Sequence, residues 1–130
     1  MDTFSRETLA AEYVTGLVEG AGSFTYSRSS KQLALYFGLK LPLTDRPLLE
    51  ALQAFFGVGR IYETGASAYY RVTRHQDLPR VVAHFERYPL RSRKRETFDV
   101  WRQMIEAKQS FRRPDREQLE QLVAEMRARR

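Results

Sequence analysis

Residues 13–24, YVTGLVEGAGSF, constrain the fold most, because they place glycines inside and just after a segment with helical periodicity. Apolar side chains recur at three- and four-residue spacing over residues 6–19, which predicts a helix. A glycine inside a helix costs about 1 kcal/mol relative to alanine. Gly16 and Gly20 lie four residues apart and therefore share one face of this helix. The pattern indicates either close packing of another backbone against that face or termination of the helix by Gly20 and Gly22.

The rest of the chain predicts two pairs of strands among further helices. Alternating apolar and polar residues predict strands on both sides of a polar turn at 27–31, and again on both sides of a turn at 64–65. Helical periodicity returns in four later segments: 44–57, 77–88, 94–109 and the highly charged 115–130. Antiparallel strands with helices on one face predict one α+β domain over residues 1–130, with the second face of its sheet free.

Period-two alternation predicts which side chains point from this free face. They are polar, basic or aromatic: Thr25, Ser27, Gln32, Tyr36, Lys40, Arg60, Tyr62, Tyr69, Arg71 and Thr73. The chain carries a net charge of +6, which favours a polyanionic partner. A β-ribbon fits the DNA major groove, so a nucleic-acid platform is the preferred interpretation. The alternatives are a solvated surface and a module that binds a peptide or an acidic protein.

The basic residues divide into two expected roles. Arginine and lysine recognise guanine edges and glutamine recognises adenine, so we expect direct base contacts from Gln32, Lys40, Arg60 and Arg71. Phosphate contacts position a protein on DNA but do not recognise its sequence. We expect them from the cations of the turn at 27–31 and of the run RYPLRSRKR: Arg28, Lys31, Arg91, Arg93 and Arg95. A shift of strand register by one residue would exchange the two faces of the sheet.

Several other classes of protein are disfavoured. The chain has no cysteine, so disulfides and thiolate metal sites are excluded. It has neither a signal-peptide pattern nor an apolar run of membrane length, which predicts a soluble protein with no membrane partner. We expect it in the cytoplasm, or in an organellar matrix if it is organelle-encoded. His75 and His84 lack an acid-rich ligand set between them, and each is expected to be an ordinary surface or core histidine.

Three segments together resemble the LAGLIDADG homing endonucleases. YVTGLVEGAGSF resembles the motif that names the family, and LLEALQAFFGVGRIY resembles its second helix with the Gly-x-Gly entry to its third strand. HFERYPLRSRKRETFDVWRQMIE resembles a third family segment, and the resemblance covers about residues 7–109 in the expected order. It implies an αββαββα fold with an antiparallel four-stranded saddle sheet and helices on one face.

The resemblance also implies a homodimer, because the chain contains one motif and two-motif members of the family fuse both halves. The motif helices of two copies would touch through Tyr13, Val14, Gly16, Leu17 and Gly20. A two-fold dimer would favour a pseudo-palindromic site on double-stranded DNA.

The chemistry implied by the resemblance is Mg²⁺-dependent hydrolysis of both DNA strands. In the family an acid at the penultimate motif position holds the metal near the scissile phosphate, but here that position is Ala21, whose methyl group cannot bind a cation. Metal binding at this position could involve only the backbone of Gly20 and Ala21, or an acidic side chain restored at position 21. Glu19 matches an earlier motif acid that mainly supports structure. Lys94 matches a lysine near the family's active site, where it can stabilise phosphate charge or polarise water.

Two main hypotheses follow from these residues. The first is a site-specific DNA-binding homodimer whose cleavage is lost or disabled and which needs no cofactor. The second is an active Mg²⁺-dependent homing endonuclease that makes a double-strand break at a long pseudo-palindromic site, as intron or intein mobility requires, with Glu19 as a nonstandard ligand. An RNA maturase-like role and a protein-interaction module are further alternatives.

Overall fold

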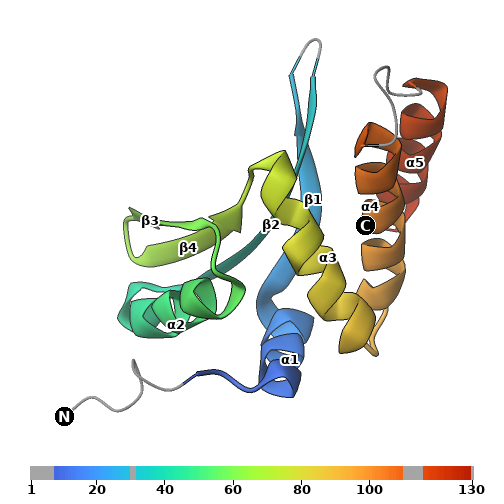
Figure 1. Cartoon of the computed structure of the whole chain (residues 1–130). Helices are drawn as coiled ribbons and strands as arrows, with labels where there is room; N and C mark the ends of the chain where they lie inside the picture. The colour runs from blue at the N-terminus through green and yellow to red at the C-terminus, as the bar shows by residue number, and fades with distance from the viewer. Residues whose placement is uncertain (1–7, 30–31, 110–115, 130) are drawn as a thin grey trace.

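The computed structural model describes residues 8–29, 32–109 and 116–129 (Figure 1). Along the chain, the helices and strands are α1 (Ala11–Ala21), β1 (Gly22–Arg28), β2 (Leu33–Pro42), α2 (Arg46–Phe56), β3 (Arg60–Thr64), β4 (Ser67–Val72), α3 (Leu78–Arg87), α4 (Lys94–Gln109) and α5 (Arg116–Ala128). Two short 3₁₀ turns, Leu43–Asp45 and His75–Asp77, precede α2 and α3. The first seven helices and strands follow the expected order αββαββα, and α4 and α5 extend it.

The four strands form one antiparallel sheet in the order β1-β2-β4-β3. Helices α1 to α4 lie on one side of this sheet, and α5 packs on the outer side of α4 (Figure 1). The predicted α+β class and sheet are therefore confirmed. Within the described residues, no helix combines the length and apolar character needed to cross a lipid bilayer.

An aromatic cluster at Phe24 joins the sheet to the helices. The Phe24 ring centroid lies 5.1–5.3 Å from those of four other aromatic residues, Phe37 on β2, Phe85 on α3 and Phe98 and Trp101 on α4. All five side chains are buried. Tilted and edge-to-face aromatic pairs at such distances add about 0.5–1.5 kcal/mol each beyond the burial of their area. This cluster fixes which face of β1 is turned toward the helices.

The bounds of α1 differ from the expected 6–19. The helix starts at Ala11, after an extended Ala10, and passes through Gly20 to Ala21. Thus Gly20 does not terminate the helix, which ends at Gly22, where a Cβ atom would lie only 2.6 Å from Val18 Cγ1. Gly22 is required because the chain turns into β1 directly against the last turn of α1. The expected start of the helix before residue 8 lies outside the described residues.

Helix α4 covers the open edge of β1 with side-chain donors at seven-residue spacing. Lys94 Nζ donates to Gly22 O at 2.6 Å, and Trp101 Nε1 donates to Thr25 O at 3.0 Å. Lys108 Nζ donates to Leu33 O at the start of β2. Seven residues make about two helical turns, so the three donors share one face of α4. Edge strands carry unpaired backbone groups that invite other chains, and the bonds from Lys94 and Trp101 satisfy part of the β1 edge.

A buried polar pair ties α1 to α3. Thr15 Oγ1 donates to Tyr88 O at 2.8 Å, so the hydroxyl accepts a hydrogen bond from His84 Nε2 at 3.1 Å. Burial lowers the pKa of His84 to about 4, and the negative charge of Glu12 only partly opposes this shift. His84 is thus the expected core histidine, neutral at physiological pH.

Stability should therefore fall as the pH falls from 6.5 toward 4. In this window the unfolded chain protonates His84 and the folded protein does not, so the free energy of unfolding should drop by roughly 1–3 kcal/mol. Urea denaturation at a series of pH values measures this loss. A His84→Gln variant should lose most of the pH dependence. His75→Gln should lose less, because burial lowers the pKa of His75 by a smaller amount. An unchanged slope in His84→Gln would contradict the assignment.

Candidate nucleic-acid interface

The outward face of the sheet is defined by the burial of the opposite one. Alternate residues of β2 and β4, such as Phe37 and Tyr70, are fully buried toward the helices. The residues between them point away: Thr25, Ser27, Tyr36, Lys40, Arg60, Tyr62, Tyr69 and Arg71. Gln32 and Thr73 are exposed beside the ends of β2 and β4. The structure therefore brings the ten residues expected on the free face to one side of the sheet.

The cations of this outward face stand against aromatic rings. The Arg71 guanidinium carbon lies 5.1 Å from the ring centroid of Tyr69 and 5.5 Å from that of Tyr36. Lys40 Nζ lies 5.8 Å from the Tyr69 centroid. Cation–π contacts restrict these side chains while leaving their hydrogen-bond donors available. The arrangement presents pre-positioned donors to a ligand that covers the sheet.

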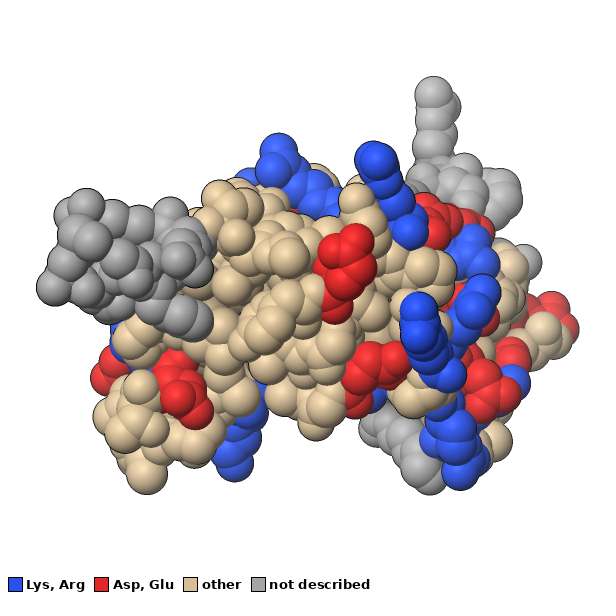
Figure 2. Space-filling model, turned by 90° about the horizontal axis from the view of Figure 1, so that it is seen from below, with Lys and Arg blue, Asp and Glu red and all other residues tan. Residues whose placement is uncertain are grey.

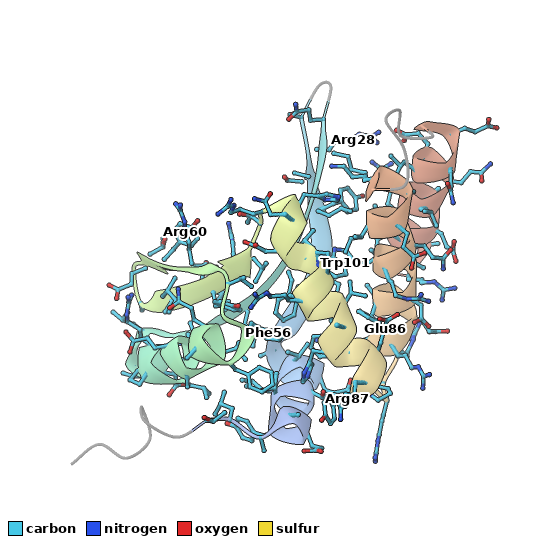
Figure 3. The ribbon with its side chains drawn as sticks, in the orientation of Figure 1. Arg28, Phe56, Arg60, Glu86, Arg87 and Trp101 are labelled. Atoms are coloured by element: carbon cyan, nitrogen blue, oxygen red, sulfur yellow. The ribbon has the colours of Figure 1, made fainter. Side chains whose placement is uncertain are left out.

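Two arginines lie directly opposite each other on neighbouring strands. Arg60 on β3 and Arg71 on β4 are Cα partners, and both are exposed. In Figure 3, Arg60 extends from β3 away from the helices. Like charges in directly opposed positions of a sheet destabilise it. An anion placed between the two guanidinium groups would remove this repulsion.

The outward positions of the described strand residues contain no carboxylate. Glu63 on β3 has the opposite orientation and forms an ion pair with Arg46 on α2, at 2.6 Å. The outward face is therefore positively charged without local compensation from its own strands. A polyanion therefore meets no carboxylate from these outward strand positions, while Asp77, just before α3, lines a small pocket with Arg60 and Thr73.

The expected phosphate contacts are placed in different ways. Arg91, Arg93 and Arg95 are exposed around the start of α4. Arg28 forms an ion pair with Glu120 of α5, near the end of β1 (Figure 3), so its charge is compensated within the chain. The phosphate contact expected at Arg28 stays a prediction, and Glu120 of α5 is a partner that sequence spacing does not place there. Lys31 lies outside the described residues.

The end of α1 is held by Lys94, the first residue of α4. Its ammonium nitrogen lies 2.9 Å from Val18 O and 2.6 Å from Gly22 O, on either side of Ala21 in the sequence. Burial lowers the pKa of Lys94, and the charge of Glu19 partly opposes this shift. Lys94 thus lies beside the motif position that lacks an acid, as expected from the sequence, with its charge on backbone carbonyls.

Glu19 holds the loop before α4. Its carboxylate accepts hydrogen bonds from the Arg91 backbone N–H at 2.6 Å, from the Ser92 backbone N–H at 3.3 Å and from the Ser92 hydroxyl. Burial alone would raise the pKa of Glu19, but these bonds and the nearby Lys94 charge outweigh it and hold the pKa below its ordinary value. The Ser92 hydroxyl in turn accepts from the Lys94 backbone N–H at 3.1 Å. Glu19 therefore has the geometry of a structural residue.

The donor set at this site does not fit a magnesium ion. Mg²⁺ requires oxygen ligands and is usually held by one or two carboxylates. Ala21 offers a methyl group, and the Glu19 carboxylate faces the loop at 91–92. No cluster of three His, Cys, Asp or Glu residues with metal-binding geometry occurs within the described part of the chain.

A groove of about 710 Å³ lies beside this site, between the start of β1 and the start of α4. Ser23 and Thr25 line one wall, and Arg93, Lys94 and Thr97 line the other. Arg129, from beyond the end of α5, also lines the groove, where it forms ion pairs with Glu96 and Glu125. The sequence offers no signal for Arg129 at this place, since only the packing of α5 on α4 brings it there.

Gly16 and Gly20 of α1 have no packing role against the described residues of the chain. A Cβ atom at Gly16 or Gly20 would meet nothing within 4 Å. Tyr13 is 50% exposed and Leu17 is half-buried, whereas Val14 is completely buried in the core. The expectation that Val14 contacts a second copy is therefore wrong, because its side chain already packs inside this one. Figure 2 shows that the centre of the face on the α1 side is mostly uncharged, while charges gather toward α4 and α5.

Comparison with known proteins identifies the family. Residues 14–105 match the sequence profile of the LAGLIDADG endonucleases. The chain belongs to the LAGLIDADG endonuclease family. A curated relative, an uncharacterized 50.9 kDa protein in ND4 intron 1 of Podospora anserina, is 32% identical over 113 residues. This alignment covers 79% of the present chain and 25% of the relative.

Solved structures of LAGLIDADG proteins share the fold. The meganuclease I-AabMI bound to uncleaved DNA has a TM-score of 0.84 and 27% identity, and the match covers 91% of this chain and 44% of I-AabMI. The homing endonuclease I-TnaI has a TM-score of 0.74 at 23% identity, with coverage of 92% and 99%. The chain thus spans about a quarter of the curated relative and less than half of I-AabMI, but nearly all of I-TnaI.

The structural role of Glu19 gives a test. A Glu19→Gln variant should lose about 1 kcal/mol of stability at neutral pH, since it removes charge-assisted hydrogen bonds that are partly exposed to water. Because the pKa of Glu19 is lowered on folding, the stabilisation it gives is present above pH 4.5 and disappears as the pH falls through the folded value. Denaturation of the unaltered protein and of Glu19→Gln should show a difference in the free energy of unfolding at neutral pH that becomes smaller at acidic pH. Unchanged stability combined with lost metal binding would instead make Glu19 a ligand.

Proposed function

We propose that this protein is a homodimer that binds double-stranded DNA site-specifically through the outward face of its sheet and does not cleave it. The opposed arginines of this face, Arg60 and Arg71, carry the proposal. Their repulsion has no carboxylate to relieve it among the outward residues of the described strands. DNA phosphates and the acceptor atoms of guanine supply the missing negative partners.

The outward face and its surroundings support a division between residues that recognise DNA bases and residues that hold the protein on the phosphate backbone. Lys40, Arg60 and Arg71 project from the strands, where a β-ribbon in the major groove would bring them to base edges. Arg91, Arg93 and Arg95 surround the start of α4 and are placed to meet the phosphate backbone. Gln32, beside the β1–β2 turn, adds a residue suited to adenine.

We propose that the dimer forms through the exposed side of α1. Gly16 and Gly20 reduce helix propensity, yet a Cβ atom at either position would meet none of the described residues, so a contact with another helix supplies their physical reason. Tyr13 and Leu17 add apolar area on this face. A symmetric pair of copies would place two sheets over one duplex and select a pseudo-palindromic site.

The absence of cleavage is proposed from Ala21 and from the engagement of Glu19. A two-fold partner would bring the same methyl group, so dimerisation does not complete a carboxylate pair. The name of the Podospora relative places it in an intron, which supports descent from a mobile intron or intein element. We propose a location in the cytoplasm or an organellar matrix accordingly.

Selection of binding sites from random duplex DNA tests the function. We expect a long, nearly symmetric site, bound with a steep salt dependence because several phosphates release counterions. The recovered duplex incubated with Mg²⁺ should remain uncut. An Ala21→Asp variant tests whether position 21 supplies the missing ligand, since cutting by this variant alone would locate the loss there. Cutting by the unaltered protein, or a failure to bind any duplex, contradicts the proposal.

A larger side chain at Gly16 separates dimer formation from folding. Among the described residues, none lies within 4 Å of a Cβ atom at this position, so Gly16→Leu should keep or raise the melting temperature of the subunit. The same change should weaken the dimer by at least tenfold, because it forces the two helices apart. Sedimentation at a series of concentrations measures this, and Ala54→Leu, which adds a leucine side chain at an exposed position of α2, is the control. A dimer of unchanged strength would exclude this interface.

A further inference from the structure

Gly38 occupies an outward position in the middle of β2, between Tyr36 and Lys40. A glycine inside a strand weakens it and often marks a place where another group approaches closely. The φ angle of Gly38 is not positive, so the backbone conformation does not require a glycine here. A Cβ atom at this position would lie 2.9 Å from Tyr70 O and 3.3 Å from Arg71 Cγ. The missing side chain therefore leaves room for the backbone of β4 and for the side chain of Arg71.

The side chain of Arg71 covers the gap at Gly38. The two residues are Cα partners across the β2–β4 pair, and Gly38 is buried although it faces outward. The Arg71 guanidinium carbon lies 5.5 Å from the ring centroid of Tyr36, a diagonal neighbour on β2, and 5.1 Å from that of Tyr69 on β4. Diagonal neighbours in a sheet lie within reach of long and aromatic side chains. Arg71 thus extends from β4 toward β2, with one aromatic ring on each strand beside its charged end.

The contacts that restrict Arg71 leave its hydrogen-bond donors available. They are contacts with aromatic rings, on which a planar guanidinium can stack while it still presents a fork of N–H donors. This fork matches the O6 and N7 acceptors of guanine in the major groove. An arginine that is ordered before binding loses less side-chain entropy when it meets its base. We therefore expect a stronger preference for guanine from Arg71 than from an arginine that is free to move.

The other cations of the outward strand positions lack this combination. Lys40 Nζ lies 5.8 Å from the Tyr69 centroid, but an ammonium group is a point charge without the bidentate fork. Arg60 has the fork, but the cation–π contacts among the described residues do not include it. Of these three cations, Arg71 alone has both a bidentate donor set and a position restricted by aromatic rings.

We propose that Gly38, Tyr36 and Tyr69 are positioning residues that hold Arg71 for one guanine in each half of the bound duplex. This base pair is then the one that the protein discriminates most strongly. The inference rests on the proposed DNA-binding function and adds to it the contact that sets the sequence preference. The glycine supplies the space for the Arg71 side chain, and the two rings restrict its guanidinium.

The test measures affinity for a fluorescein-labelled duplex carrying the selected site, and for duplexes in which each base pair is replaced in turn in both halves. Replacing the base pair read by Arg71 should weaken binding of the unaltered protein by at least about tenfold. Arg71→Ala should remove this loss at one base pair, which identifies the position. Tyr36→Leu should reduce the loss at the same base pair to about threefold, and Tyr36→Phe, which keeps the ring, should restore it. Tyr69→Leu should relax this base pair and also the one read by Lys40, because Tyr69 contacts both cations.

Tyr62→Leu is the matched control. Tyr62 points outward from β3 as the Cα partner of Tyr69, and the cation–π contacts among the described residues do not include it. Its replacement removes the same kind of ring from the same face. Tyr62→Leu should lower the affinity for all duplexes to a similar extent and keep the discrimination at the base pair read by Arg71.

Two further variants test whether the positioning residues act through Arg71. In an Arg71→Ala background, Tyr36→Leu should change no base preference further, because the side chain that the ring restricts is gone. Gly38→Ala should relax the base pair read by Arg71. It should also lower the melting temperature, because the new Cβ meets Tyr70 O as well as Arg71.

Nitrogen relaxation of the arginine Nε–Hε groups tests the positioning in the free protein, without DNA. Arg71 should be more ordered than Arg60 on the picosecond-to-nanosecond timescale, and Tyr36→Leu should reduce this order. Tyr36→Phe should retain it. An Arg71 side chain as mobile as that of Arg60 overturns the inference.

The binding outcomes separate this inference from the proposed function. Unchanged discrimination in Tyr36→Leu at the base pair read by Arg71 overturns the inference while leaving DNA binding intact. The same holds if Tyr62→Leu relaxes that base pair as much as Tyr36→Leu does, or if Arg71→Ala relaxes no base pair. Failure to bind any duplex overturns the proposed function and the base contact with it, whereas the relaxation measurement decides separately whether Arg71 is held in place.

Discussion

The end of α1 and the start of α4 meet at a contact, here called the joint, that depends on two opposite charges. Each of the two helices contributes one of them. Glu19 extends from α1 to the backbone of the loop before α4, and Lys94 extends from α4 to the carbonyls at the end of α1. Each charge is satisfied by backbone groups of the other segment, so the pair fixes main chain and not only side chains. Gly22 begins β1 at this joint, and its packing against Val18 requires the absence of a Cβ. The joint therefore sets where the sheet begins.

The position of α4 determines which surfaces of the sheet remain open. From Lys94 the helix runs along the edge of β1, and Trp101 bonds to Thr25 O. Trp101 also packs on Phe24, so one residue covers the strand edge and closes the core. The helices then occupy one face and this edge, while the opposite face keeps Lys40, Arg60 and Arg71 exposed beside tyrosines that are exposed or half-buried. The open face of the sheet is thus a consequence of where the helices pack.

The sequence predicts the local features of this arrangement because they are periodic. Alternation places Tyr69 and Arg71 together on the face opposite to the one that Tyr70 occupies, and the bounds of α4 match the expected 94–109. Contacts between distant segments are not periodic, and those were missed: the ion pair between Arg28 and Glu120 and the presence of Arg129 in the groove. Val14 was assigned to a dimer because helical spacing identifies an apolar side chain but not the surface against which it packs. The significance of Ala21 was different again, since it follows from the family resemblance and not from the periodicity of the sequence.

Loss of the acid at position 21 is compatible with an intact fold because the joint does not use that position. Its two charges are at Glu19 and Lys94, and Ala21 packs partly against the core as a small apolar residue. The outward face has a separate basis, since Arg71 is held by Tyr36 and Tyr69. A single change at position 21 can therefore remove carboxylate chemistry while the joint and the sheet surface stay as they are. In this chain the charges of the joint, the cations of the outward face and position 21 are different side chains, so a change at one of them leaves the contacts of the others in place.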